Sequence, residues 1–283
     1  DMRGLNVVEI PFDYAEWNLD IDGLAGVAKK AKKSPLIIIG TAYQLFPFPC
    51  REVKKIADEL GAKVWYDAAH LLGLMAGGRW QDPLKEGVDV VIGTAQKTLS
   101  GPIGGIILTN DQEISEKIDR YFPGHFSTFG HGREAALAIT LAEWMEFGKD
   151  YATQIITNAK VLAKSLAKEG FNVVGKHKGY TESHIVIVDV KEHGGGKTAA
   201  TRLEQANVIL SAIRLWSLEE NFEGLRLGVT EMTRYGMKEN EMRTIAEFIR
   251  RVVIDEEDPS KVGKEVAEFR EPFNQVHYCF ENP

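Results

Sequence analysis

The sequence is poor in cysteine and has no long apolar run, and each shortage excludes a class of protein. Only Cys50 and Cys279 occur among the 283 residues, too few for a disulfide framework and without the spacing of a metal site. No stretch approaches the roughly 20 apolar residues that a membrane-spanning helix needs, and no secretory leader pattern opens the sequence. We therefore expect a cytoplasmic protein without a metal site or a membrane partner.

Positive charge is also in short supply. Lys and Arg number 34 against 41 Asp and Glu, which gives a formal net charge of −7. A protein whose main partner is nucleic acid needs a basic face, so we expect no such partner. Hydrophobic residues make up 44% and charged residues 27%, as in ordinary globular proteins, and the length suits about two domains.

The first half of the sequence alternates strand-like and helix-like segments. The predicted strands are Val7–Phe12, Leu36–Thr41, Lys63–Tyr66, Val88–Gly93 and Gly105–Thr109, and the predicted helices are Ile21–Lys33 and Arg51–Leu60. This alternation predicts a mostly parallel sheet with covering helices, and so an α/β fold. The loop before the last strand is too short for a parallel crossover, which predicts an antiparallel neighbour. The early first strand suggests a fragment that needs another segment to complete its sheet.

The second half has a different texture, which predicts a smaller α+β domain over 151–283 after a large domain over 1–150. Its predicted helices are Arg133–Phe147, Tyr151–Lys168, Ala199–Ala206 and Glu239–Ile254, and its predicted strands are Phe171–Val174, His184–Val190, Val208–Ala212 and Leu225–Val229. Gly194–Thr198 is interpreted as a turn, and Asp255–Pro283 as a polar tail on the surface.

Two charged residues follow neighbouring predicted strands. Asp67 comes directly after one strand and Lys97 shortly after the next. Ligands of open parallel sheets bind outside the carboxyl ends of the strands. A lysine amine and a carboxylate are what pyridoxal phosphate (PLP) requires, because one forms an imine with its aldehyde and the other keeps its pyridine nitrogen protonated. A helix cap for the aspartate and a solvated surface charge for the lysine are the structural alternatives.

Several segments resemble serine hydroxymethyltransferase, a family of PLP-dependent enzymes. They are Tyr-Asp-Ala-Ala-His-Leu-Leu-Gly-Leu-Met-Ala-Gly-Gly (66–78), Thr-Ala-Gln-Lys-Thr-Leu-Ser-Gly-Pro-Ile-Gly-Gly (94–105), Phe-Pro-Gly (122–124) and Gly-Leu-Arg-Leu-Gly-Val-Thr-Glu-Met-Thr-Arg-Tyr-Gly-Met (224–237). The Glu-x-Thr-Arg ending is most similar to archaeal-type members. The resemblance runs in order over nearly the whole sequence and implies the fold-type-I, aspartate aminotransferase-like architecture.

The resemblance also implies a role for each matching residue. Lys97 would be the Schiff-base lysine, and Asp67 would pair with the pyridine nitrogen. His70 would contact the ring of the cofactor. Thr94 would sit beside the imine and assist its exchange between lysine and substrate. Thr41 would hydrogen-bond the phenolic oxygen of the cofactor.

The remaining implied contacts are with the substrate and the cofactor phosphate. Arg226 would clamp the carboxylate of a small amino acid, for which a buried structural ion pair is the alternative. A loop that begins at Gly124 would reach the phosphate of a partner subunit, because these active sites are shared across a homodimer. Gln96, next to the lysine, would be a cofactor neighbour. Gln96 and Ile103 depart from the family pattern, which has histidine and arginine there.

The implied activity is the reversible interconversion of serine, or a related β-hydroxy amino acid, and glycine in one-carbon metabolism. The resemblance allows a tetrahydropterin cosubstrate, tetrahydrofolate or tetrahydromethanopterin. Two alternatives stay open. The departures at Gln96 and Ile103 are compatible with a pterin-independent aldolase, transaldolase or racemase. The absence of the family's N-terminal third is compatible with a truncated, non-catalytic scaffold subunit.

Overall fold

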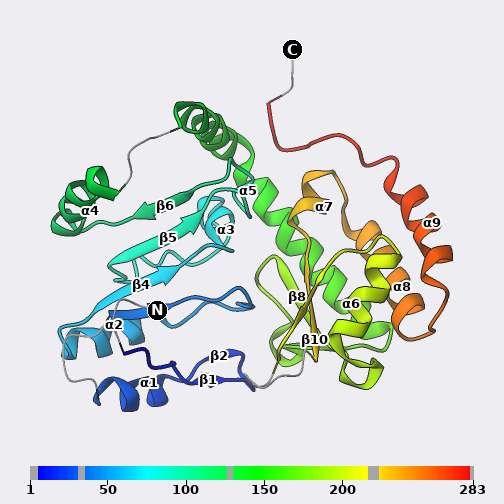
Figure 1. The fold of residues 1–283 in the computed structure, drawn as a ribbon, viewed down its shortest axis with the longest axis horizontal. Helices are drawn as coiled ribbons and strands as arrows, with labels where there is room; N and C mark the ends of the chain where they lie inside the picture. The colour runs from blue at the N-terminus through cyan, green and yellow to red at the C-terminus, as the bar shows by residue number, and fades with distance from the viewer. Residues whose placement is uncertain (1–5, 31–35, 126–129, 216–222, 281–283) are drawn as a thin grey trace. The chain divides into compact units, whose positions relative to one another are not determined.

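The protein is described from a computed structural model (Figure 1). The residues that it describes are 6–30, 36–125, 130–215 and 223–280. The pattern of contacts divides the chain into two compact units. The first unit comprises Asp1–Ala76 and Trp80–Ala142, and the second comprises Gly77–Arg79 and Glu143–Pro283.

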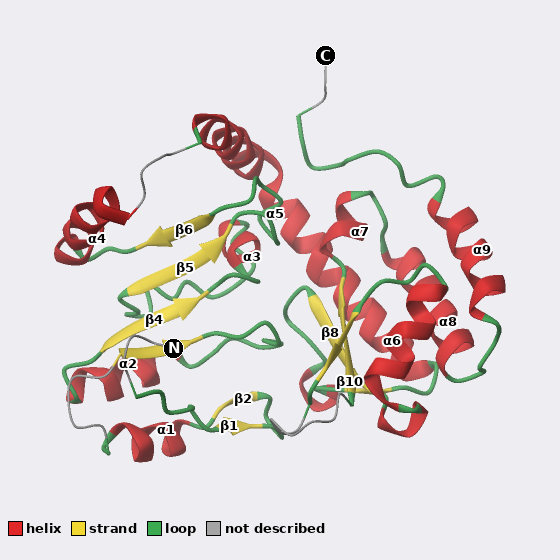
Figure 2. Ribbon diagram, viewed as in Figure 1, coloured by secondary structure: helices red, strands yellow, loops and turns green. Residues whose placement is uncertain are grey.

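The first unit contains a four-stranded sheet of order β3-β4-β5-β6 (Figure 2). The first three strands are parallel, and β6 is antiparallel to β5, as the short loop predicted. The elements of the unit are β1 (Phe12–Asp13), β2 (Asn18–Leu19), α1 (Ile21–Ala28), β3 (Leu36–Ile39), α2 (Cys50–Glu59), β4 (Lys63–Asp67), α3 (Leu72–Ala76), β5 (Val90–Thr94), β6 (Gly105–Leu108), α4 (Gln112–His125) and the start of α5 (His131–Lys168).

One face of this sheet forms the core of the first unit. Ile37, Ile39, Val64 and Tyr66 alternate along β3 and β4 and are at most 5% exposed. Helix α2 contacts β4 and buries its own apolar side. Helix α3 lies on the same face, because a Cβ at Gly93 of β5 would come within 2.6 Å of a Leu72 methyl carbon.

The second unit contains an antiparallel sheet of order β7-β8-β10-β9. Its central strand β8 is almost wholly buried, which agrees with the predicted α+β texture. The elements are the rest of α5, β7 (Asn172–Val173), β8 (Ile185–Asp189), α6 (Gly195–Gln205), β9 (Ser211–Ile213), β10 (Gly224–Gly228), α7 (Thr230–Arg234), α8 (Glu239–Val253) and α9 (Pro259–Arg270), with short 3-10 turns at Lys176–Lys178 and Lys191–His193.

Helix α5 corrects the prediction of two helices separated near residue 150. It is a single helix from His131 to Lys168. The glycine at position 148 suggested a break, but packing requires it there, because a Cβ would lie 2.4 Å from the ring of Trp144. The two compact units divide within this helix, between Ala142 and Glu143.

Three further predictions were wrong. The segment Val7–Phe12 forms no strand before Phe12, and Val7 and Val8 are exposed. Most of Gly194–Thr198 belongs to helix α6 rather than to a turn. The tail Asp255–Pro283 contains helix α9, which begins at a capping aspartate followed by a proline.

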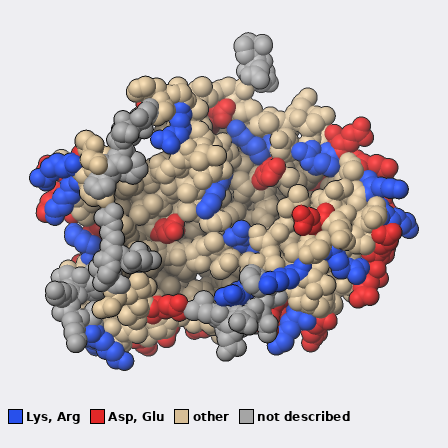
Figure 3. All heavy atoms as spheres, viewed as in Figure 1, with Lys and Arg blue, Asp and Glu red and all other residues tan. Residues whose placement is uncertain are grey.

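The surface carries mixed charge. On the face of the molecule shown in Figure 3, lysine and arginine side chains are interspersed with aspartate and glutamate side chains. Within the part of the chain that the structure describes, no helix is long and apolar enough to cross a membrane.

Candidate functional site

The site begins where β4 ends. Asp67 is the last residue of β4, and its Oδ1 accepts a hydrogen bond from the backbone N–H of Ala69 at 2.8 Å. Among the described residues Oδ2 has no hydrogen-bond partner, and the side chain is exposed. One carboxylate oxygen therefore fixes the local turn while the other remains available to a ligand.

Lys97 lies in a tight turn directly after β5. Ser100 closes this turn by donating its N–H to the carbonyl of Lys97 at 2.9 Å, with a left-handed φ of 57°. Thr98 and Leu99 are each 1% exposed, whereas Lys97 is exposed and its side chain forms no hydrogen bond or ion pair with any described residue. Buried neighbours thus anchor the turn and leave the amine free.

Asp67 and Lys97 follow from adjacent parallel strands. In the register of β4 and β5, Asp67 lies opposite Ile92. A side-chain hydrogen bond ties the two strand ends together, because Thr94 donates its hydroxyl to the carbonyl of Ala69 at 2.8 Å. The structure therefore places the carboxylate and the lysine turn at the same end of the sheet, as the sequence predicted.

The end of β3 approaches the same place. Gly40 has a φ of 127°, and a Cβ on it would lie 2.4 Å from the carbonyl oxygen of Asp67. Only glycine allows this approach, and the chain then continues into Thr41, whose half-buried hydroxyl accepts from the N–H of Tyr43 at 3.3 Å. His70 is half-buried in the loop after β4.

A second glycine supports the lysine turn from below. The N–H of Gly73 in α3 donates to the Thr98 hydroxyl at 3.0 Å. A Cβ on Gly73 would lie 2.2 Å from the carbonyl oxygen of Thr98. The sequence motifs gave Gly73 no role of its own, although a glycine inside a short apolar helix is a signal of close packing.

A buried polar network lies behind β4 and was also missed. Gln44 and Trp80 both donate to the hydroxyl of Tyr66, at 2.8 and 3.3 Å, and that hydroxyl lies 3.3 Å from Oε1 of Gln81. Burial raises the pKa of Tyr66 above its ordinary value, so the hydroxyl stays protonated. These residues hold the strand that ends in Asp67, and no sequence motif marks Gln44 or Gln81.

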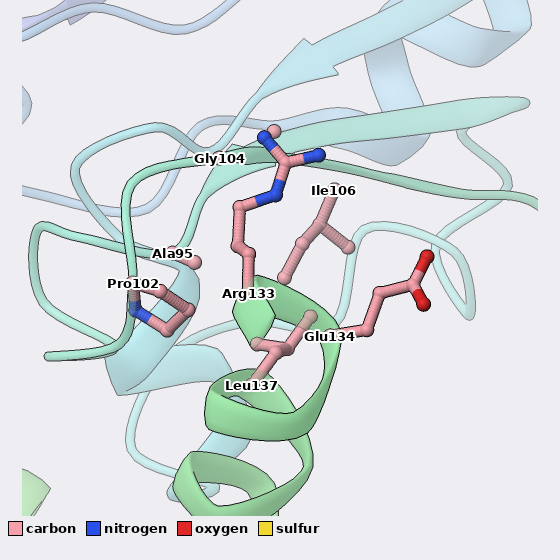
Figure 4. A pocket seen from close by; sticks show the side chains of 8 residues that line it. Ala95, Pro102, Gly104, Ile106, Arg133, Glu134 and Leu137 are labelled. Atoms are coloured by element: carbon pink, nitrogen blue, oxygen red, sulfur yellow. The ribbon is translucent and has the colours of Figure 1, made fainter. Parts of the chain in front are cut away.

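The loop that follows Lys97 returns to the start of its own turn. The N–H of Ala95 donates to the carbonyl of Gly104, and the N–H of Gly104 donates to the Gln96 side chain at 3.2 Å. Figure 4 shows a pocket beside this loop, with Arg133 of α5 extending along Gly104. Gln96 therefore has a structural bond here, and Ile103 is 78% exposed.

Two predicted site residues lie elsewhere. Arg226 belongs to β10 in the second unit, where it is half-buried and donates to the Ser211 hydroxyl at 3.4 Å. Gly124 lies in the last turn of α4, so the prediction of a loop beginning at Gly124 was wrong. Residues 126–129 of that loop lie outside the described residues.

The donor set at the strand ends fits PLP. A free amine on Lys97 suits its aldehyde, and a free oxygen on Asp67 suits its pyridine nitrogen. Thr41 and Thr94 add hydroxyl groups at the neighbouring strand ends. Both charged groups are exposed, so this chain's first unit does not itself desolvate them.

Comparisons with known proteins agree with this site. The family model described as serine hydroxymethyltransferase matches residues 5–249. A curated serine hydroxymethyltransferase of Staphylothermus marinus is 46% identical over 98% of this chain and 64% of its own length. Another, of Pyrococcus furiosus, is 47% identical over 99% of this chain and 68% of its own length.

A solved structure has the same fold. The L-threonine transaldolase from Pseudomonas fluorescens superposes with a TM-score of 0.89 and 27% identity, over 96% of this chain and 63% of that chain. The predicted fold is thereby confirmed, as is the resemblance to archaeal relatives. The chain spans about two thirds of the length of the curated relatives that it matches. This protein therefore belongs to the serine hydroxymethyltransferase family.

Proposed function

We propose that this chain is the PLP-binding and substrate-binding part of an enzyme that interconverts serine, or a related β-hydroxy amino acid, and glycine. One observation carries the proposal. The free amine of Lys97 and the free carboxylate oxygen of Asp67 lie at the ends of adjacent strands, in a chain of this family. The homologues named above are themselves described as serine hydroxymethyltransferases.

In this proposal Lys97 holds PLP through its Nζ and Asp67 holds the proton on the pyridine nitrogen. When bound, PLP supplies an electron sink for the electrons left on Cα as the Cα–Cβ bond breaks. The buried anchors Thr98 and Leu99 fix the lysine backbone while its amine stays accessible. The hydrogen bond from Ala69 orients the Asp67 carboxylate before any ligand arrives.

The remaining residues position groups around this pair. Thr94 is proposed to exchange a proton with the amine that replaces lysine at the cofactor, and its bond to Ala69 fixes its hydroxyl beside the turn. Thr41 would donate to the phenolic oxygen, and His70 would contact the ring. Gln96 is proposed as a neutral neighbour that holds the loop, since its amide cannot titrate.

The second unit would recognise the substrate. Arg226 is proposed to bind the amino-acid carboxylate through its guanidinium, and its contact with Ser211 pre-orients that group. A bidentate pair of this kind gives strong and directional binding. A cytoplasmic homodimer, in which the segment after Gly124 reaches a partner's phosphate, belongs to the same proposal, as does a tetrahydropterin that carries the one-carbon unit.

A transaldolase without a pterin is the second candidate. Two observations favour it. The solved neighbour is an L-threonine transaldolase, and Gln96 and Ile103 remove a titratable and a positively charged group that the family pattern places near the lysine. Both candidates use the same lysine and carboxylate, so they differ in the acceptor of the one-carbon or aldehyde fragment.

A cosubstrate experiment separates the two candidates. The purified protein is incubated with PLP and serine, with and without tetrahydrofolate or tetrahydromethanopterin, and glycine is measured. Glycine formation that depends on a pterin supports the hydroxymethyltransferase. Turnover that is indifferent to pterin and faster with threonine supports the transaldolase. A folded protein that never develops the visible absorbance of bound PLP contradicts both and leaves the non-catalytic scaffold.

A further inference from the structure

The large sheet has one apolar face that is left open. Leu36 and Ile38 of β3 and Ile107 of β6 are 41%, 43% and 46% exposed. The register places Ile38 beside Trp65 and Ile92 beside Ile107, so these five residues share one side of the sheet. We call Leu36, Ile38, Trp65, Ile92 and Ile107 the open face.

An open face of this kind is unusual for parallel strands. Such strands occur almost only in sheets that are covered on both faces. Here α2 and α3 cover the opposite face, where Ile37 and Ile39 of β3 are at most 5% exposed. The same strand thus buries its odd-numbered side chains deeply and leaves its even-numbered ones near half exposure. Contiguous exposed apolar surface marks an interaction site.

The edge of the sheet is incomplete in the same region. The strand order puts β6 at an edge, with β5 as its one partner among the described strands. Its sequence, Gly-Ile-Ile-Leu, carries neither the charge nor the proline that protects free edges. Ile107 and Leu108 point to opposite faces and are both more than 40% exposed. A free edge with apolar residues on both sides is a template for another strand.

We infer that the open face and the β6 edge bind a polypeptide outside these 283 residues. It would add a strand to β6 and lay an apolar surface over the open face. Its identity follows from length, because curated relatives that match nearly all of this chain are matched over only 64% and 68% of their own length. The occupant is the polypeptide equivalent to that remaining third.

A second copy of this chain suits the surface less well. Asp67 lies on the same side of β4 as Trp65, and Lys63 does too, because side chains alternate along a strand. Two copies stacked face to face would bring two exposed Asp67 carboxylates and two Lys63 amines into one apolar interface. Burial of such charges costs several kcal/mol per ion unless each is well paired.

The position of Asp67 gives the inference a consequence for the site. A polypeptide over the open face would lie beside this carboxylate and would remove water from it. Desolvation strengthens electrostatic contacts within a site. Binding itself requires no cofactor, so the inference can be tested apart from the proposed function.

The test uses the whole chain and two defined probes. The probes are the unmatched residues of the Staphylothermus marinus relative and those of the Pyrococcus furiosus relative, each produced as a separate polypeptide. We expect a one-to-one complex by light scattering, with slower hydrogen exchange at the amides of Ile106, Ile107 and Leu108. The variant Ile38→Glu/Ile107→Glu should weaken binding by about a hundredfold, roughly tenfold for each buried side chain.

A matched variant separates this surface from general changes in charge. Ile209→Glu alters an isoleucine that is 86% exposed in the second unit, and we expect unchanged binding. Three results would overturn the inference. They are no complex with either probe while the chain remains folded, a complex equally tight with Ile38→Glu/Ile107→Glu, and a dimer of this chain alone that the same variant dissociates.

Discussion

Replacement of Gly73 by alanine should displace the turn that carries Lys97. The new Cβ would lie 2.2 Å from the Thr98 carbonyl oxygen, 2.4 Å from its carbon and 2.8 Å from the nitrogen of Leu99. All three atoms are backbone, so no side-chain rotation relieves the overlap. The Thr98 hydroxyl would also lose good geometry with the Gly73 N–H, now at 3.0 Å.

The magnitude follows from these two effects. Overpacking a close contact costs about 1–3 kcal/mol, and a weakened buried hydrogen bond adds about 1 kcal/mol. We therefore expect Gly73→Ala to lower the free energy of unfolding by about 2–4 kcal/mol. Because Thr98 is the residue after Lys97, the visible absorbance of bound PLP should fall as well, even at temperatures where the variant is fully folded.

Urea unfolding gives the first quantity and a PLP titration the second. Gly26→Ala is the matched control, because nothing lies within 4 Å of a Cβ there and the site is inside helix α1. That variant should gain up to about 1 kcal/mol from helix propensity. A Gly73→Ala protein with wild-type stability and full PLP absorbance would refute the packing argument.

Two other predictions concern carboxylates. Asp67→Asn should weaken PLP binding at least tenfold, measured by titration, with the free energy of unfolding unchanged, because its carboxylate is exposed; equal PLP affinity would contradict the assigned role. Burial opposes ionisation of Asp89, but hydrogen bonds from the Val64 N–H, Lys63 and Lys54 outweigh it and lower its pKa. Its stabilisation is therefore complete above the ordinary carboxyl pKa near 4 and is lost as the pH falls through the lower folded-state value. Asp89→Asn should be less stable than wild type in urea at pH 7 and equally stable at acid pH; a constant difference would count against this ionisation.

The sheet of the first unit was predictable from its sequence for physical reasons. Short β-branched runs separated by helical segments leave few arrangements other than parallel strands. The loop Gly101–Gly105 is too short for a crossover, and β6 is indeed antiparallel. Asp67 and Lys97 could be found because ligands bind at the ends of such strands, and that rule needs no knowledge of packing.

The errors arose where tertiary contacts decide. Gly148 suggested the end of a helix, but the ring of Trp144 occupies the space that a Cβ would need. Val7 and Val8 have strand propensity, yet no described strand pairs with them, and propensity alone does not form a strand. Helix α9 was predictable, because Asp258 and Pro259 are a capping residue and a first-turn proline.

The central claim is that Lys97 is the residue that holds PLP. The direct measurement is reduction of the PLP-loaded protein with borohydride, followed by peptide mass spectrometry. We expect one modified peptide that contains Lys97, its loss in Lys97→Arg, and its retention in Lys85→Arg, a lysine with an 83% exposed side chain in the same unit. Reductive labelling on another lysine, or labelling of the Lys97→Arg protein as strong as that of wild type, would contradict this assignment.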